Sequence, residues 1–260
     1  MELTREQQER YVRQIAVGEI NVQGQEKLLH SKVLVVGAGG LGSPAAMYLA
    51  GSGVGTIGIA DPDKVDLSNL QRQILHGMGD LGKDKVQSAQ EAIRWINPDT
   101  QVRAYPVAVG ADNVMELISD YDIVIDASDN FSTKFLINDA CVLAGKPFVH
   151  AGVIRFQGQL MTYVPGQGPC YRCIFRTQPK DGTVPTGKQA GVLGMVCGVI
   201  GSLQAMEAVK YLTGVGELLT GRLLTCNMFT MNFRTVNLPK RTAECAVCGE
   251  HPVITKPGSV

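Results

Sequence analysis

The chain has 260 residues, of which 45% are apolar, and this is enough for one α/β domain with a substantial core. Its formal net charge is zero, which argues against a general nucleic-acid-binding surface and against attraction to an anionic membrane. The N-terminal segment is too polar for a signal peptide, so we expect a cytoplasmic protein. Seven cysteines in such a chain favour metal ligation or reactive thiols over a disulfide framework.

The first thirty residues predict a helical arm. Thr4 and Gln7 have capping-box spacing at the start of a polar helix, and a second short helix covers about 22–29. Arg10 and Arg13 lie between these helices, where residue type alone is equally compatible with solvated surface arginines.

A nucleotide-binding fingerprint occupies residues 32–61. A valine-rich strand ends in G-x-G-x-x-G, a helix of small residues follows, and a second apolar strand ends at Asp61. In this context Gly37 permits the tight turn, Gly39 lets the backbone approach a phosphate, and Gly42 lets the helix pack against the strand. The helix N-terminus favours phosphate, and Asp61 can accept hydrogen bonds from ribose hydroxyls. The pattern therefore predicts a nucleotide site rather than an ordinary turn.

The segment 61–75 is compatible with a surface loop, but it follows the carboxyl end of a strand, where open α/β sheets bind ligands. Four of its side chains can bind phosphate or ribose oxygens: Ser68, Asn69, Gln71 and Arg72.

A helix at about 83–96 follows this loop, with Lys85 in its first turn. A lysine there opposes the helix dipole, so Lys85 either serves a bound polyphosphate or is simply an exposed surface residue.

Asp129 follows the apolar strand 122–126, at the same edge of the predicted sheet. A carboxylate there can hold Mg²⁺, which prefers one or two carboxylates together with phosphate oxygens and water. The alternative is that Asp129 is the N-cap of the next helix, at about 131–144.

The rest of the chain continues the alternation of strands and helices, which predicts an α/β fold. A polar stretch with no periodicity, 174–190, is predicted to be a long crossing loop, and a buried helix follows at about 191–212. The other predicted elements are strands at about 101–107, 147–152, 159–163, 222–228 and 231–238 and a short helix at 113–119.

Two C-x-x-C pairs predict a tetrahedral metal site built from Cys170, Cys173, Cys245 and Cys248. Soft thiolates in a closed tetrahedron favour Zn²⁺, which would pin the C-terminal tail to the sheet. A redox or iron role is the alternative, although neither pair opens a helix after a strand as in thioredoxin-like units. The remaining cysteines show no sign of reactivity: Cys141, Cys197 and Cys226.

Several motifs stand in one order along the chain: RYVRQI, GAGGLGSP, DPDKVDLSNLQRQ, ASDN, GVIGSLQAMEAVKYL and the paired C-x-x-C. Together they closely resemble the bacterial ubiquitin-activating-enzyme-like family, the sulfur-carrier adenylyltransferases of molybdopterin and thiamine synthesis, over about 11–249. The resemblance implies a Rossmann-like doubly wound α/β sheet, parallel in its N-terminal half and antiparallel in its C-terminal strands, with a Cys₄ zinc knuckle. It implies one domain, 1–260, divided into an arm (1–30), a nucleotide-binding half (31–152) and a carrier-binding half (153–250).

The resemblance also implies an activity and its participants. Members bind MgATP and adenylate the C-terminal Gly-Gly carboxylate of a small β-grasp sulfur carrier, which releases pyrophosphate. The implied nucleotide-binding residues are Gly37, Gly39, Gly40, Gly42, Asp61, Ser68, Asn69, Leu70, Gln71, Arg72, Lys85, Asp129 and Asn130. The implied catalytic residues are Arg72, Lys85, Asp129 as the Mg²⁺ ligand, and Arg13, which would reach the γ-phosphate of the partner subunit in a homodimer.

The chain departs from this family at one position. Relatives often have a cysteine in the crossing loop, whereas the aligned position here is Gly187, and no cysteine lies between Cys173 and Cys197. This puts a covalent thioester or persulfide step in doubt and leaves adenylation intact. No sulfurtransferase segment follows the second C-x-x-C pair, so we expect a separate protein to donate sulfur.

Two other functions are compatible with parts of the sequence. An NAD-dependent oxidoreductase would use the glycine motif and Asp61, but it gives no role to Arg72, Lys85 and Asp129 and has no evident acid–base pair. A non-catalytic module that binds a carrier protein would bind without turning over ATP. The sequence does not specify which carrier or pathway the chain serves.

Overall fold

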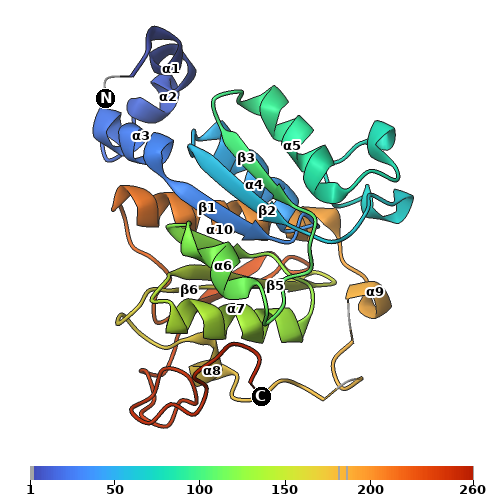
Figure 1. Cartoon of the computed structure of the whole chain (residues 1–260), viewed down its shortest axis with the longest axis vertical. Helices are drawn as coiled ribbons and strands as arrows, with labels where there is room; N and C mark the ends of the chain where they lie inside the picture. The colour runs from blue at the N-terminus through green and yellow to red at the C-terminus, as the bar shows by residue number, and fades with distance from the viewer. Residues whose placement is uncertain (1–2, 181, 186, 260) are drawn as a thin grey trace.

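One mixed sheet forms the centre of the chain in the computed structural model, which describes residues 3–180, 182–185 and 187–259 apart from the side chain of Lys188 (Figure 1). The order of its eight described strands is β3-β2-β1-β4-β5-β6-β7-β8. Neighbours from β3 to β5 are parallel, and those from β5 to β8 are antiparallel. The strands are β1 (Lys32–Val36), β2 (Thr56–Ala60), β3 (Gln101–Tyr105), β4 (Ile123–Asp126), β5 (Phe148–Ile154), β6 (Gln157–Tyr163), β7 (Arg222–Asn227) and β8 (Asn232–Asn237).

This arrangement confirms the expected doubly wound sheet with antiparallel C-terminal strands. The parallel strands β2 and β4 are buried along their whole length, as their continuous apolar runs require when helices cover both faces. The C-terminal strand β8 is exposed along its length, because it is the last strand of the sheet.

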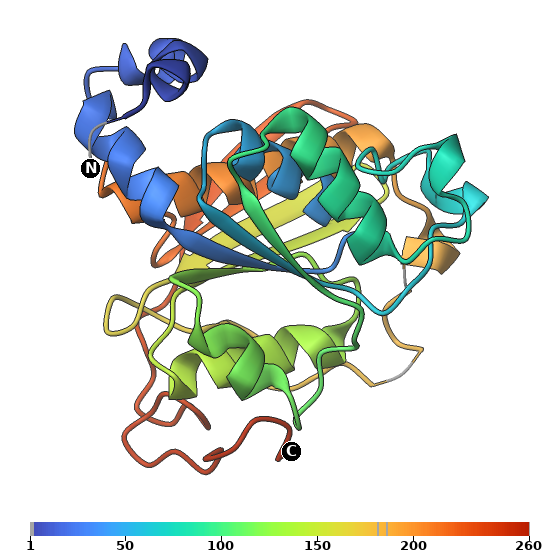
Figure 2. The ribbon, with the colours of Figure 1, turned by 45° about the horizontal axis from the view of Figure 1, so that its top comes forward.

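Helices cover both faces of the sheet (Figure 2). One face packs against α4, α5 and α10, and the other packs against α6 and α7, with α8 beside α7. The helices are α1 (Arg5–Arg10), α2 (Val12–Ile15), α3 (Asn21–His30), α4 (Gly42–Gly51), α5 (Lys85–Ile96), α6 (Val114–Ser119), α7 (Phe131–Leu143), α8 (Tyr171–Ile174), α9 (Gly187–Ala190) and α10 (Gly194–Thr213), with short 3₁₀ turns η1 (Leu67–Asn69) and η2 (Met78–Asp80).

The N-terminal arm lies against the C-terminal ends of two of these helices. Thr4 and Gln7 form both bonds of the predicted capping box. The buried Tyr11 accepts a hydrogen bond from Asn97, just after α5, and Gln14 donates to the carbonyl of Ser52, just after α4. The arm is therefore fixed at the end of the sheet where the parallel strands begin.

The opposite end, where the parallel strands finish, contains the topological switch point between β1 and β4. The connections on either side of β1 run in opposite directions there, which opens a crevice at the end of the sheet. The crossing loop, which contains α9, approaches the same end (Figure 1). No described helix is both long enough and apolar enough to cross a membrane.

Candidate active site

The glycine motif forms the turn between β1 and α4. Gly37 has φ of +100°, which favours glycine, and a Cβ there would lie 2.8 Å from the carbonyl oxygen of Ala127. A Cβ at Gly42 would collide with the carbonyl of Gly37, so the helix packs directly on the turn. Gly39 has no such restriction, since its nearest neighbour would be 3.7 Å away. The predicted roles of Gly37 in the tight turn and of Gly42 in close helix packing agree with this geometry.

The second residue of the motif, Ala38, is held from two sides. Its N–H donates to Asp61 Oδ2 at 2.8 Å, and its carbonyl oxygen lies 2.9 Å from His76 Nε2. His76 Nδ1 lies 2.8 Å from Ser88 Oγ on α5. Burial lowers the pKa of His76, so the ring is neutral and Nε2 donates to Ala38. Contacts within the chain thus hold the glycine turn from both sides of Ala38.

Lys85 is the first residue of α5 and is only 5% exposed. Its Nζ lies 2.8 Å from Asp63 Oδ2 and 3.8 Å from Asp61 Oδ1. Burial raises the pKa of Asp61, and the nearby Lys85 ammonium opposes that shift. The alternative of an exposed surface lysine is therefore wrong, because Lys85 is fixed beside the predicted ribose-binding carboxylate.

The loop after β2 is organised by its own side chains. Asp66 accepts hydrogen bonds from the N–H and Oγ of Ser68, and Asn69 Oδ1 accepts from the N–H of Asp66. These bonds form the cap of η1, so Ser68 and Asn69 hold the loop in shape. Arg72 Nη1 donates to the carbonyl of Ser68 at 3.0 Å, which directs Arg72 back along the loop.

A cavity of about 610 Å³ opens at the switch point. At one end it is lined by the glycine turn and by charged side chains; at the other it is lined by β5, β6, β7 and β8. Of the predicted site residues, the lining includes Gly37, Gly39, Gly40, Asp61, Arg72, Lys85, Asp129 and Asn130. The described lining does not include Arg13, Gly42, Ser68, Asn69, Leu70 or Gln71.

Asp129 and Asn130 have different local roles. The N-cap of α7 is Asn130, whose side chain accepts from the N–H of Thr133 at 2.8 Å. The alternative that Asp129 caps this helix is therefore wrong. The Asp129 carboxylate is exposed, lines the cavity, and has no hydrogen bond or ion pair among the described residues. This uncommitted carboxylate suits a Mg²⁺ ion that shares its ligands with phosphate oxygens.

A buried polar network lies beside Asp129 and was not predicted. The fully buried Asp126, at the end of β4, contacts Lys134 Nζ at 3.2 Å, His150 Nδ1 at 2.9 Å and Ser128 Oγ at 2.6 Å. Burial alone would raise the pKa of Asp126, but Lys134 and His150 outweigh it and lower the pKa to about 2. Lys134, His150 and Ser128 also line the cavity.

Arg13 is far from the cavity of its own chain. It is an exposed residue of α2, whose neighbours Tyr11 and Gln14 contact residues just after α5 and α4. Because α5 begins at the cavity and its 12 residues run about 18 Å away from it, the arm lies at the opposite end of the sheet. Arg13 therefore cannot act on a nucleotide in its own cavity.

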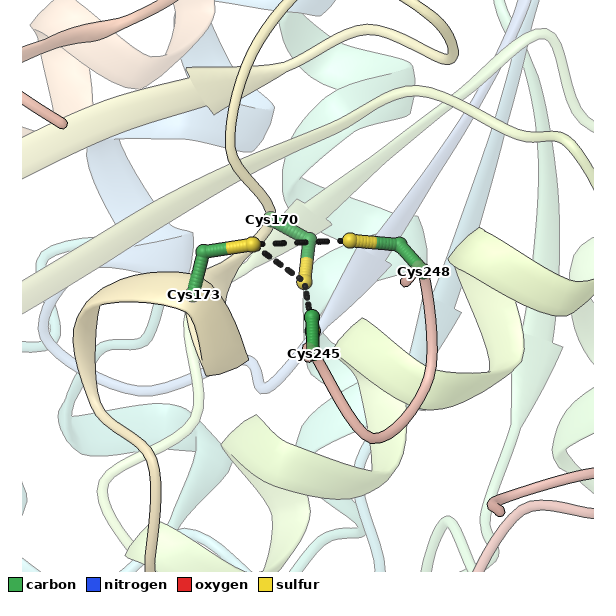
Figure 3. A group of neighbouring side chains, drawn as sticks. All are labelled: Cys170, Cys173, Cys245 and Cys248. Atoms are coloured by element: carbon green, nitrogen blue, oxygen red, sulfur yellow. Dashed lines mark hydrogen bonds between the residues drawn. The ribbon is translucent and has the colours of Figure 1, made fainter. Parts of the chain in front are cut away.

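The four predicted metal ligands come together (Figure 3). Cys170 and Cys173 lie at α8, and Cys245 and Cys248 lie on the C-terminal tail, with three Sγ–Sγ distances of 3.4, 3.6 and 3.9 Å. A tetrahedral zinc site with Zn–S bonds of about 2.3 Å requires Sγ–Sγ distances of about 3.8 Å. The donor set and spacing fit Zn²⁺.

The cluster is attached to the fold through α7. Arg172 forms a two-pronged ion pair with Asp139, at 2.6 and 2.8 Å, and the N–H of Tyr171 donates to Asn138 Oδ1 at 2.8 Å. The cysteine pairs therefore connect the tail to a helix that covers the sheet.

The sequence pattern of the ThiF family matches residues 11–247. The chain belongs to the ThiF family. It is 43% identical over 257 residues to the sulfur carrier protein adenylyltransferase of Thermus thermophilus, covering 97% of this chain and 94% of that protein. It is 46% identical over 247 residues to the adenylyltransferase and sulfurtransferase MOCS3 of Aedes aegypti, covering 95% of this chain. This ThiF-family chain spans just over half, 56%, of the length of that relative.

Solved structures of the same architecture exist. Escherichia coli MccB superimposes with a TM-score of 0.84 at 24% identity, covering 96% of this chain and 75% of that chain. The structure of MccB with ATP superimposes with a TM-score of 0.77 at 25% identity, covering 88% of this chain and 69% of the MccB chain. These similarities establish that the ThiF-family chain shares the MccB fold.

Proposed function

We propose that the protein uses ATP to adenylate the C-terminal Gly-Gly carboxylate of a small ubiquitin-like sulfur carrier, releasing pyrophosphate. The observation that carries this proposal is the convergence of Arg72, Lys85 and Asp129 on one cavity beside the Gly37 turn. The names of the Thermus and Aedes relatives, both adenylyltransferases, support it.

The nucleotide is proposed to lie across the switch point. Asp61 accepts from the ribose, and the phosphates follow Gly39 and Gly40 toward the N-terminus of α4, where free N–H groups favour anions. The cations of Arg72 and Lys85 offset the charge on the phosphates. Asp129 would hold Mg²⁺, which would supply further charge compensation at the phosphates.

The chemistry needs no nucleophile from the protein. An oxygen of the carrier carboxylate forms a bond with the α-phosphorus, and the bond from that phosphorus to the pyrophosphate oxygen breaks. Positioning and charge compensation then supply most of the rate. This agrees with Gly187, which lines the cavity and has no thiol for a thioester or persulfide. The two cysteines in the same lining, Cys197 and Cys226, are buried, and burial raises the pKa of each thiol.

The carrier tail is proposed to enter from the β5–β8 side of the cavity. Asp61 directs the nucleotide toward β2, so the other half of the crevice is open to the acyl substrate. That half is lined by glycines and neutral or basic polar residues, which suit a Gly-Gly tail ending in a carboxylate: Gly152, Gly158, Gln157, Gln159, Asn232 and Arg234.

The remaining parts are proposed to complete a dimeric enzyme. Arg13 cannot reach its own cavity, so its proposed role at the γ-phosphate requires a second copy of the chain.

The cysteine cluster is proposed to hold structural Zn²⁺, and residues 153–250 are proposed to form the carrier-binding half of one domain. We further propose that the enzyme works in the cytoplasm and receives sulfur from a separate donor protein.

The test is ATP–pyrophosphate exchange with a panel of β-grasp proteins ending in Gly-Gly. We expect exchange with at least one carrier and none with that carrier after removal of its last glycine. Exchange without any carrier, or carrier binding without exchange, would contradict the proposal. Thermal protection by MgATP but not by NAD would separate it from the oxidoreductase alternative, since ligand at 100 times its Kd stabilises by about 2.7 kcal/mol.

A further inference from the structure

One nitrogen in the buried network beside Asp129 has no hydrogen-bond partner in the part of the chain that the structure describes. His150 is 1% exposed, its Nδ1 contacts Asp126, and its Nε2 makes no hydrogen bond to the described residues. Burying an unsatisfied polar atom costs about 1–3 kcal/mol, so such an atom in a ligand cavity indicates a partner that arrives with the ligand. His150 lines the cavity described above.

The surroundings determine which role Nε2 can take. Asp126 lies between His150 and Lys134, whose ammonium also donates to the carbonyl of Ala151 at 2.7 Å. A carboxylate requires a donor, so Nδ1 carries the proton, and the neutral ring leaves Nε2 as an acceptor. Burial together with Lys134 lowers the pKa of His150, in agreement with a neutral ring. The missing partner is therefore a hydrogen-bond donor.

The position of His150 excludes the sugar and base of the nucleotide as that donor. Asp61 follows β2 and His150 lies on β5, and the order β2-β1-β4-β5 separates them by three strand spacings, about 14 Å. The nucleotide extends from the switch point toward β2, away from β5. ATP phosphates carry no donor at neutral pH. Of the two substrates, the acyl substrate, which approaches from the β5 side, is therefore the one that can bring a donor to Nε2.

We propose that His150 Nε2 accepts a hydrogen bond from a peptide N–H of the carrier's Gly-Gly tail. This inference rests on the proposed function and assigns the tail-binding atom within that site. Glycine side chains offer no donor, so the backbone N–H is the only donor that a diglycine tail presents. The bond would hold the tail in the extended form that delivers its carboxylate to the α-phosphorus, beside Asp129 and Ser128.

Two variants separate this role from a purely structural one. His150→Asn keeps an N–H near the Nδ1 position for Asp126 and removes the Nε2 acceptor. His150→Gln does the reverse, because its amide oxygen reaches the Nε2 position. We expect His150→Asn to raise the KM for the carrier by about 2- to 12-fold, the value of one hydrogen bond, with the KM for ATP unchanged. We expect His150→Gln to keep a KM for the carrier near that of the wild type and to unfold at lower temperature.

A modified carrier makes the test specific to the N–H. Carriers in which an ester replaces one peptide bond of the tail lack that N–H and keep the same length. With wild-type enzyme, the ester at one of the two glycines should raise the KM by about 2- to 12-fold, whereas with His150→Asn the same ester should have little further effect.

The inference is overturned if His150→Asn behaves as the wild type while His150→Gln is impaired, which is the pattern of a residue that only supports Asp126. The inference is also overturned if each of the two esters raises the KM for the carrier by the same factor with His150→Asn as with the wild-type enzyme. In either case, carrier-dependent exchange by the wild-type enzyme would leave the proposed adenylation standing, so the two claims fail separately.

Discussion

His76 Nε2 lies 2.9 Å from the carbonyl oxygen of Ala38, so a residue of the loop after β2 holds the glycine-rich turn after β1. On the other side of the same residue, Asp61 accepts from the Ala38 N–H. These two contacts connect segments that are distant in the sequence and hold the turn from both sides of Ala38. The two contacts also make the turn sensitive to the protonation state of His76.

The first prediction concerns pH and stability. His76 has an ordinary pKa of about 6.5 in the unfolded chain and a lowered pKa in the folded protein. As the pH falls below about 6.5, the unfolded state takes up a proton that the folded state rejects, so the free energy of unfolding falls by up to about 1.4 kcal/mol at pH 5.5. His76→Gln, which keeps a donor for Ala38 and does not titrate, should lose less stability between pH 7.5 and 5.5. Urea unfolding measures the free energy of unfolding of the wild type and of His76→Gln at both pH values. Equal losses in the two proteins would show that His76 is not the group that causes the pH dependence.

The second prediction compares two glycines of the same motif. Gly39→Ala should fold with nearly wild-type stability and bind MgATP weakly, since its Cβ would meet no close neighbour and Gly39 lines the cavity. Gly42→Ala should be strongly destabilised, because its Cβ would strike the backbone of Gly37, which cannot move aside. Thermal unfolding and MgATP titration separate the two effects. Tight MgATP binding by folded Gly39→Ala would show that phosphate does not approach that residue.

The third prediction separates Asp129 from its neighbour. Asp129→Ala should lose most carrier-dependent exchange at unchanged stability, because the carboxylate has no described partner. Asn130→Ala is the matched control and should lower the free energy of unfolding by about 0.5–2 kcal/mol through loss of the α7 cap. If Asp129→Ala retains full exchange over a range of Mg²⁺ concentrations, the metal assignment is wrong.

The fourth prediction concerns the cysteine cluster. Metal analysis of the purified protein should find one zinc per chain, and Cys245→Ser should reduce both the zinc content and the melting temperature, since the tail loses its link to α8. Cys226→Ala changes a buried thiol outside the cluster and should leave the zinc content intact. Full zinc occupancy in Cys245→Ser would rule out a Cys₄ site.

Much of the fold follows from sequence patterns because the central parallel strands β1, β2 and β4 are short apolar runs bounded by glycine or polar residues. The strands from β1 to β8 all fall within a few residues of the predicted ranges. The convergence of Cys170 and Cys248 was predictable as well, since two C-x-x-C pairs together supply the four thiolates of one tetrahedral metal site. The family assignment from the motifs is confirmed by the match over 11–247.

The contacts that shape the site were not predictable, because they depend on distances between segments. Nothing in the sequence shows that Lys85 is buried against Asp63, or that His150 meets Asp126. Asp129 and Asn130 are adjacent and both suit a helix cap, so only the structure distinguishes them. A histidine on an apolar strand was the one available signal for His150, and the same pattern is typical of an ordinary core residue. The ligand roles of the site residues stay predictions.

The most direct test of the account is intact-mass analysis of the carrier after incubation with the enzyme and MgATP. The proposed adenylation predicts a carrier heavier by one adenylyl group, formed with stoichiometric pyrophosphate. This product should be absent when the last glycine of the carrier is removed or when Asp129→Ala replaces the wild-type enzyme. A carrier that binds tightly and returns unmodified, or release of ADP and phosphate in place of pyrophosphate, would contradict it.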